Sequence, residues 1–244
     1  MESTGDIALC LAVALVAWLY SSVGHAGASG YIAVMTLAGF APDRIKPLAL
    51  VLNILVASIA SVQFYRAGHF SWKLFWPIAL LAAPMAFVGG YLSLPLAWFK
   101  VLLGLVLAGS AVWLLNPIPS QEQVHEPARH KTILAGAGLG LLSGLTGTGG
   151  GIYLTPLLLI MGWAKTKTAS AVSALFILVN SVSGLAGVVS SGRPMPQGWY
   201  ALAVAVVIGG SIGATLGSFR LPVRSARILL SIVMFIAAAK LLAS

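Results

Sequence analysis

Residues 146–151 read Thr-Gly-Thr-Gly-Gly-Gly and interrupt an otherwise apolar part of the chain. Glycine tolerates positive φ and carries no side chain, so this run favours an unwound segment whose backbone N–H groups point outward. The apolar run that follows, at about 152–163, is shorter than the roughly 20 residues that cross a bilayer. The stretch therefore predicts a break between two helices, the second of which is short.

A second interruption lies at residues 24–30, Gly-His-Ala-Gly-Ala-Ser-Gly, and a short apolar run at about 30–41 follows it. A Walker loop would end in Gly-Lys and then Ser or Thr, and a dinucleotide motif would follow a strand of a soluble domain. Neither interruption meets these requirements, so nucleotide binding is not predicted.

The composition places both breaks in a membrane protein. Of the 244 residues, 59% are hydrophobic and 8% are charged, whereas an ordinary soluble domain has roughly 25% charged residues. The longer apolar runs are continuous rather than alternating, so they predict helices and not barrel strands. We expect an all-α polytopic membrane protein whose longer runs lie at about 7–23, 47–65, 73–92, 97–115, 132–146, 168–189, 198–217 and 223–242.

Several other classes are disfavoured by residue content. The formal charge is +9, but the basic residues are scattered between apolar runs, which suits orientation toward anionic lipid better than nucleic acid. Cys10 is the single cysteine, so no intrachain disulfide or Cys-based metal motif is expected. Residues 1–28 mimic a signal peptide, but their amino end is acidic, so cleavage is not expected. Catalytic motifs are absent, so neither an enzyme nor a cofactor is predicted.

The chain contains an internal duplication. Adding 127 to the first-half numbers pairs Asn53 with Asn180 and Trp72 with Trp199, while an offset of 123 aligns the two glycine breaks. A length difference of four residues is therefore expected between these regions, near 42–47. Transporter folds are often built from two such halves.

The predicted organisation is a first membrane repeat at 1–115, a polar linker at 116–131 and a second membrane repeat at 132–244. Each repeat would hold about five helical elements, of which the first two form a broken, re-entrant hairpin. In that arrangement the repeats are inverted, with nine basic residues on the linker side and five on the side of the termini. The positive-inside rule then places the linker in the cytoplasm and both termini outside. Parallel halves of four helices each are the alternative.

The breaks favour an anion as ligand. A helix that starts after a glycine break presents N–H groups without helical partners and a partial positive charge. The five acids are assigned to termini or loops, so the membrane interior contains no carboxylate that would suit a cation; they are Glu2, Asp6, Asp43, Glu122 and Glu126. No metal site is predicted.

Two kinds of polar side chain accompany the breaks. Asn53 and Asn180 lie in apolar helices, where an Asn either joins helices or contacts a ligand. His25 either takes up a proton coupled to transport or is a neutral side chain bonded to backbone. The predicted substrate-binding residues are Gly24, His25, Ala26, Gly27, Ser29, Asn53, Thr146, Gly147, Thr148, Gly149, Gly150, Gly151 and Asn180.

Residues 144–156, Gly-Leu-Thr-Gly-Thr-Gly-Gly-Gly-Ile-Tyr-Leu-Thr-Pro, and 169–175, Ala-Ser-Ala-Val-Ser-Ala-Leu, resemble the sulfite exporter TauE/SafE family. The resemblance covers nearly the whole chain, although the first break, with His25 and Ala-Ser, departs from the glycine-rich pattern. It implies a bacterial inner-membrane permease that moves sulfite, sulfonates or related small organic anions, commonly outward. It also implies that substrate lies at the glycine-rich segments.

The expected function is a secondary permease that works by alternating access in the bilayer, with a small anion as substrate and no nucleic-acid partner. The alternative is a channel-like or structural membrane component without a carrier cycle. The oligomeric state is left open.

Overall fold

The computed structural model describes residues 3–22, 24–116, 124–193, 199–219 and 224–243. Within these residues the chain is helical and has no strands, which confirms the predicted all-α class. The helices are α1 (Ser3–Ser21), α2 (Ala28–Leu37), α3 (Pro42–Arg66), α4 (Trp72–Tyr91), α5 (Leu96–Leu115), α6 (Arg129–Thr146), α7 (Gly151–Ile160), α8 (Thr166–Ser190), α9 (Tyr200–Phe219) and α10 (Arg224–Ala243).

Among the described residues, four helices are long and apolar enough to cross a membrane: α3, α4, α5 and α8. Helices α2 and α7 have 10 residues each, which at 1.5 Å per residue reach about half of the roughly 30 Å hydrocarbon core. Both are apolar; α2 begins at Ala28, within residues 24–30, and α7 begins at Gly151, the last residue of the second break. The prediction of a short helix after each break is confirmed.

Left-handed glycines end and restart the helices at both breaks. Gly147 closes α6 with a φ of 78°, and Gly150 precedes α7 with a φ of 82°. In the first break, Gly24 and Gly27 have φ values of 80° and 101°. A residue with a Cβ is strained at such angles, so the glycines themselves account for the positions of the breaks.

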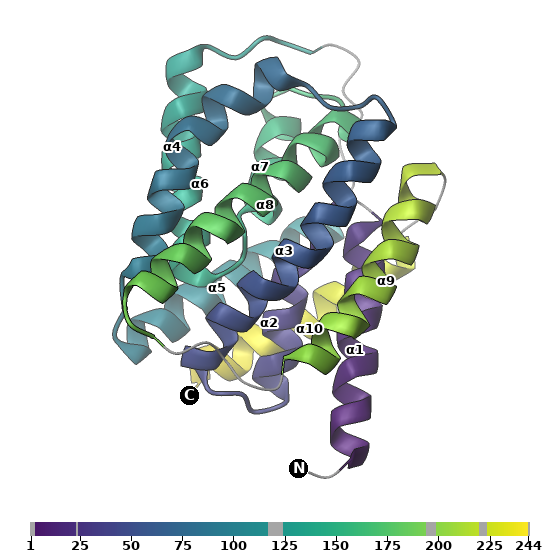
Figure 1. Cartoon of the computed structure of the whole chain (residues 1–244), viewed down its shortest axis with the longest axis vertical. Coiled ribbons are helices and arrows are strands. Elements are labelled where there is room, and N and C mark those ends of the chain that lie inside the picture. Colours follow the sequence, from purple (N-terminus) through teal and green to yellow (C-terminus); the bar gives the residue numbers. More distant parts are fainter. Residues whose placement is uncertain (1–2, 23, 117–123, 194–198, 220–223, 244) are drawn as a thin grey trace.

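The helices pack in a pattern that interleaves the two halves of the chain. Helix α4 packs against α6 and α8, α9 packs against α1 and α3, and α3 contacts α8 through the middle of the molecule. In Figure 1, α1 begins and α10 ends toward the lower end, which we call the terminal face. The upper end, where α4 and α6 begin, is the linker face.

Small residues bring α4 and α6 into backbone contact. A Cβ added to Gly136 would lie 2.0 Å from the carbonyl oxygen of Ile78, and one added to Gly140 would lie 2.2 Å from that of Ala82. Glycines spaced by four residues lie on one helix face, so α6 presents a smooth surface to α4. Gly138, on another face, has nothing within 4 Å of its Cβ position.

The helix bounds correct the position of the length difference between the halves. Helices α3 and α8 both have 25 residues. Neither helix therefore contains an insertion relative to the other, and the expectation of a length difference near 42–47 was wrong. The connection after α3 is 67–71, whereas the connection after α8 is 191–199, which is four residues longer. Asn53 lies 11 residues after Pro42, and Asn180 lies 14 residues after Thr166. The two asparagines are therefore offset by nearly one helical turn.

Candidate functional site

The second break is buried between helices, and its threonines bond one another. Thr146, Thr148 and the three glycines that follow are all buried. The hydroxyls of Thr146 and Thr148 lie 2.9 Å apart, and the Thr146 hydroxyl also donates to the carbonyl oxygen of Leu142 over 2.7 Å. Tyr153 of α7 joins these threonines, because its hydroxyl accepts from the Thr148 hydroxyl over 3.4 Å.

Asn53 lies directly against the second break. A Cβ added to Gly149 would lie 2.6 Å from Asn53 Nδ2 and 2.9 Å from Ser181 Oγ. Asn53 comes from α3 and Ser181 from α8, so the two central helices meet the unwound backbone at this one glycine. Real Cβ atoms do not approach other atoms so closely, which leaves glycine as the residue that fits.

Asn180 reaches the same break one residue further along. The Cβ position of Gly150 lies 3.4 Å from Asn180 Nδ2 and 2.8 Å from Cε1 of Phe176. The structure therefore brings both predicted asparagines to the second break, although they come from different halves of the chain.

His25 is the point at which the first break meets the second. Its Cδ2 lies 3.7 Å from the Cβ position of Gly151, the first residue of α7. The imidazole ring faces the ring of Tyr20 edge-on, with the centroids 6.4 Å apart, and the side chain is buried.

The other predicted residues of the first break contact neighbours outside this cluster. Gly24 packs against Ser170, whose Cβ is 2.5 Å from the glycine's Cβ position. The Tyr31 ring covers Gly27, and its hydroxyl donates to the carbonyl oxygen of Ala26. The Ser29 hydroxyl lies 2.9 Å from the hydroxyl of Tyr20. Of the first break, His25 is thus the side chain shown against the second break.

Buried polar atoms without a protein partner gather at this cluster. They are Asn53 Oδ1, both amide atoms of Asn180, and the hydroxyl of Ser143, whose Cβ lies 3.2 Å from the Cβ position of Gly150. A buried polar atom that lacks a hydrogen bond costs about 1–3 kcal/mol. Such groups are usually satisfied by protein, water or a ligand. The centre of the molecule therefore offers hydrogen-bonding capacity that the described protein atoms do not use.

The two acids whose side chains the structure describes are exposed. Asp43 is exposed at the start of α3, and Glu126 is exposed and paired with Lys73. The described residues contain no group of His, Cys, Asp and Glu side chains that could hold a metal ion. The available ligands are amide, hydroxyl and backbone N–H groups, which suit an anion or a neutral polar molecule.

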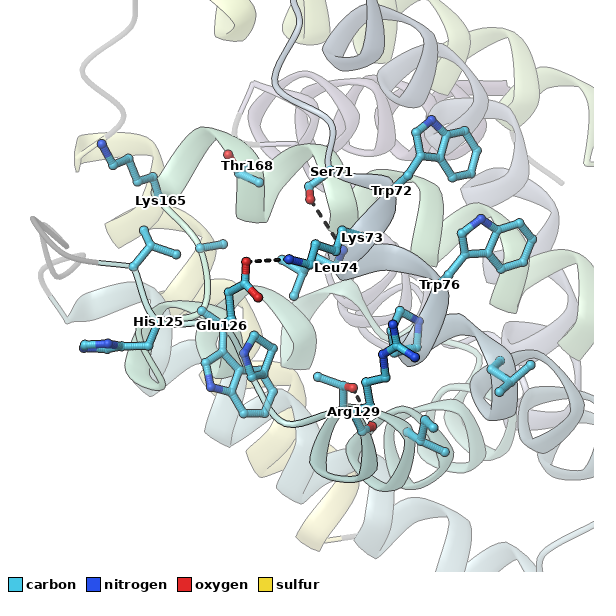
Figure 2. A pocket seen from close by; sticks show the side chains of 18 residues that line it. Ser71, Trp72, Lys73, Leu74, Trp76, His125, Glu126, Arg129, Lys165 and Thr168 are labelled. Carbon is cyan, nitrogen blue, oxygen red and sulfur yellow. Dashed lines mark hydrogen bonds and ion pairs between the residues drawn. The ribbon is translucent and has the colours of Figure 1, made fainter.

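A pocket of about 1050 Å³ opens on the linker face, which the sequence did not predict. It lies between the start of α4, residues 124–129 and the start of α8 (Figure 2). Its walls combine cations with tryptophans: Lys73, Arg129, Lys165, Trp72, Trp76 and Trp163. The residues come from three separate parts of the chain, so no local motif marks the pocket.

Lys46 is the second feature that sequence reasoning missed. It is 4% exposed, and its Cγ lies 3.2 Å from the Cβ position of Gly147 in the second break. The signal was its spacing, because Lys46 precedes Asn53 by seven residues, which is two helical turns.

Apolar helices around a buried polar centre define an integral membrane protein of the transporter class. The chain belongs to the sulfite exporter TauE/SafE family, whose model matches residues 9–241. This confirms the resemblance seen in the sequence, and the chain's role is membrane transport.

Two curated relatives carry transporter names. The chain is 38% identical over 246 residues to the probable membrane transporter protein y4hK of Sinorhizobium fredii, covering 98% of this chain and 99% of the relative. It is 30% identical over 156 residues to the probable membrane transporter protein MJ0441 of Methanocaldococcus jannaschii, covering 59% of this chain and 56% of the relative. No solved structure matches the chain.

Proposed function

We propose that the protein is a secondary permease for a small sulfur-containing or organic anion, of the sulfite and sulfonate class, and that it exports this anion by alternating access. The observation that carries the proposal is the convergence of Asn53 and Asn180 on Gly149 and Gly150, with buried amide atoms that have no partner among the described residues. The protein catalyses no reaction in this proposal. The substrate-binding residues are those predicted from the sequence, centred on the second break.

The choice of an anion rests on charge and on donors. Helix α7 begins at Gly151, so its unpartnered N–H groups and the positive end of its dipole face the cluster. A left-handed residue next to a right-handed one, as Gly150 is next to Gly151, orients neighbouring N–H groups into a concave anion site. Asp43 and Glu126, the acids whose side chains the structure describes, are exposed, so neither opposes an anion there.

Alternating access fits a chain made of two inverted repeats, 1–115 and 132–244, which we propose on two observations. The first is that the helices of the two halves follow the same order of length, with 25-residue α3 and α8 and 10-residue α2 and α7 at corresponding places. The second is that α4 packs on α6 as α9 packs on α1. Exchange of the two halves then interconverts states open to opposite sides.

We place the protein in a bacterial inner membrane with residues 116–131 in the cytoplasm and the termini outside. The support is the excess of basic residues on the linker side. The pocket on the linker face is then the cytoplasmic vestibule. Its lining residue Thr168 lies two residues from Ser170, which packs against Gly24 of the first break.

Flux into and out of proteoliposomes tests the proposal. Labelled sulfite, ethanesulfonate and acetate are the probes, and the transport of at least one of these anions should saturate and show counterflow. Gly149→Val and Asn180→Ala should abolish that flux, while Gly138→Ala, which has open space at its Cβ position, should keep it. If none of the anions moves, the substrate class is wrong, and non-saturating flux without counterflow supports a channel instead.

A further inference from the structure

Lys46 is a buried cation held by the end of a neighbouring helix. Its Nζ donates to the carbonyl oxygens of Gly89 over 2.9 Å and Gly90 over 3.2 Å, and is 3.4 Å from that of Leu92. These carbonyls form the last turn of α4 and the residue after it. A helix C-terminus attracts a cation through its unpaired carbonyls and its dipole.

Arg193 reaches the same helix end from the connection that follows α8. Its Nη2 donates to the carbonyl oxygens of Gly90 over 2.7 Å and Tyr91 over 2.8 Å, and lies 3.3 Å from that of Leu92. Lys46 and Arg193 therefore share the Gly90 oxygen, so two positive groups lie close together. Arg193 is half-buried, whereas Lys46 is buried.

The positive charge at this helix end is not balanced by a described acid. A helix dipole supplies roughly half of one negative charge, whereas two basic side chains converge on this helix end. Among the described residues the one ion pair is Lys73 with Glu126, on the linker face, and Asp43 is exposed at the start of α3. An uncompensated buried charge is costly, so an anion bound beside Lys46 and Arg193 would be electrostatically stabilised.

The position of Lys46 connects this charge to the substrate cluster. Lys46 and Asn53 lie seven residues apart on α3, so they occupy nearly the same face two turns apart. Lys46 contacts Gly147 of the second break, and Asn53 contacts Gly149. Arg193, Lys46 and Asn53 thus form a series that leads from the terminal face to the second break.

We propose that Lys46 and Arg193 form an anion-binding site on the terminal side of the second break, where a sulfonate, sulfite or carboxylate replaces the α4 carbonyls as the partner of both cations. Both basic side chains already make hydrogen bonds to the carbonyls, and an oxyanion adds the Coulomb attraction of a full negative charge, so it competes effectively with those neutral acceptors. The planar Arg193 guanidinium matches an oxyanion in a two-point contact. This inference rests on the proposed function, because it adds a step to the path of the same anion.

The test is anion binding by the purified full chain in detergent, measured as the rise in melting temperature with added sodium sulfite, ethanesulfonate or acetate at constant ionic strength. Lys46→Gln keeps a hydrogen-bond donor but removes the charge, and should raise the half-saturating concentration about tenfold or more. Lys46→Arg keeps the charge, so its half-saturating concentration should be closer to that of the native protein than to that of Lys46→Gln.

Lys240→Gln is the matched control. Lys240 also donates to carbonyls at a helix end, those of Thr36 and Leu37 in α2, so its removal reproduces the loss of such bonds away from the second break. The anion concentration that half-saturates the rise in melting temperature should be the same for Lys240→Gln as for the native protein.

The outcomes separate the two proposals. If no probe anion stabilises the native protein and none is transported, the proposed function fails, and this inference fails with it. If the native protein binds an anion and Lys46→Gln binds it equally well, the Lys46 site is wrong while the proposed function stands. Should Lys46→Gln fail to fold, Arg193→Gln decides, because unchanged anion binding in that variant also overturns the site.

Discussion

Asn53 of α3 donates through Nδ2 to the hydroxyl of Ser181 of α8 over 3.4 Å, and this pair lies directly against Gly149. One weak side-chain bond thus joins the two central helices at the point where the second break is unwound. The opposite atom of the same amide, Oδ1, has no partner in the described part of the chain. The arrangement leaves acceptors and donors available at a place where a substrate would pass.

Replacing Asn180 should separate stability from function. Both of its amide atoms are buried without a described partner, so Asn180→Leu removes a desolvation cost of about 1–3 kcal/mol. We expect an unchanged or higher melting temperature in detergent, together with at least a tenfold loss of anion flux. Asn116→Ala, at the exposed end of α5, should alter neither. A large drop in melting temperature for Asn180→Leu would show that the amide is structural.

Gly149→Ala should destabilise the protein by more than the strain of a left-handed backbone angle alone. Gly149 has a φ of 74°, and Gly68 has nearly the same φ of 75°, but nothing lies within 4 Å of the Gly68 Cβ position. Gly68→Ala therefore measures the left-handed strain alone, about 1–2 kcal/mol. Gly149→Ala adds the clash with Asn53 and should lose transport as well. Equal effects on melting temperature and full flux in both variants would contradict the site.

His25→Gln tests whether the first break carries a proton. The imidazole is the ionisable group shown beside Gly151, and histidine is the side chain best suited to changing charge near neutral pH. If transport by the native protein responds to an imposed proton gradient, the variant should keep anion flux but lose that response. The measurement is flux at fixed anion gradient with and without a pH difference. A variant that stays proton-coupled removes His25 from this role.

The contact between α4 and α6 should be sensitive to a single methyl group on one face of α6. Gly140→Ala places a Cβ 2.2 Å from the carbonyl oxygen of Ala82, and overpacking of this kind costs about 1–3 kcal/mol. Gly138→Ala changes the same helix where nothing lies within 4 Å, so its melting temperature should match the native protein. Similar melting temperatures for the two variants would mean that α4 moves away at little cost.

The amino-acid sequence alone was enough to predict the helical membrane class and both breaks. Continuous apolar runs allow little else in a bilayer, and glycine is the residue that tolerates the left-handed angles seen at Gly147 and Gly150. The family was also predictable, because residues 144–156 carry a local pattern. The apolar runs, the glycine breaks and this pattern are all local features of the sequence, which is why they could be recognised without the structure.

Tertiary structure alone decided which of these features meet. It placed Asn53 and Asn180 at the same break and put the length difference after α3 and α8 instead of near 42–47. It also showed that Lys46, which sequence reasoning missed, is a buried side chain beside Gly147. The physical reason is that the end of α4 and the connection after α8 are far from Lys46 along the chain. Only helix packing brings their charges and carbonyl oxygens together.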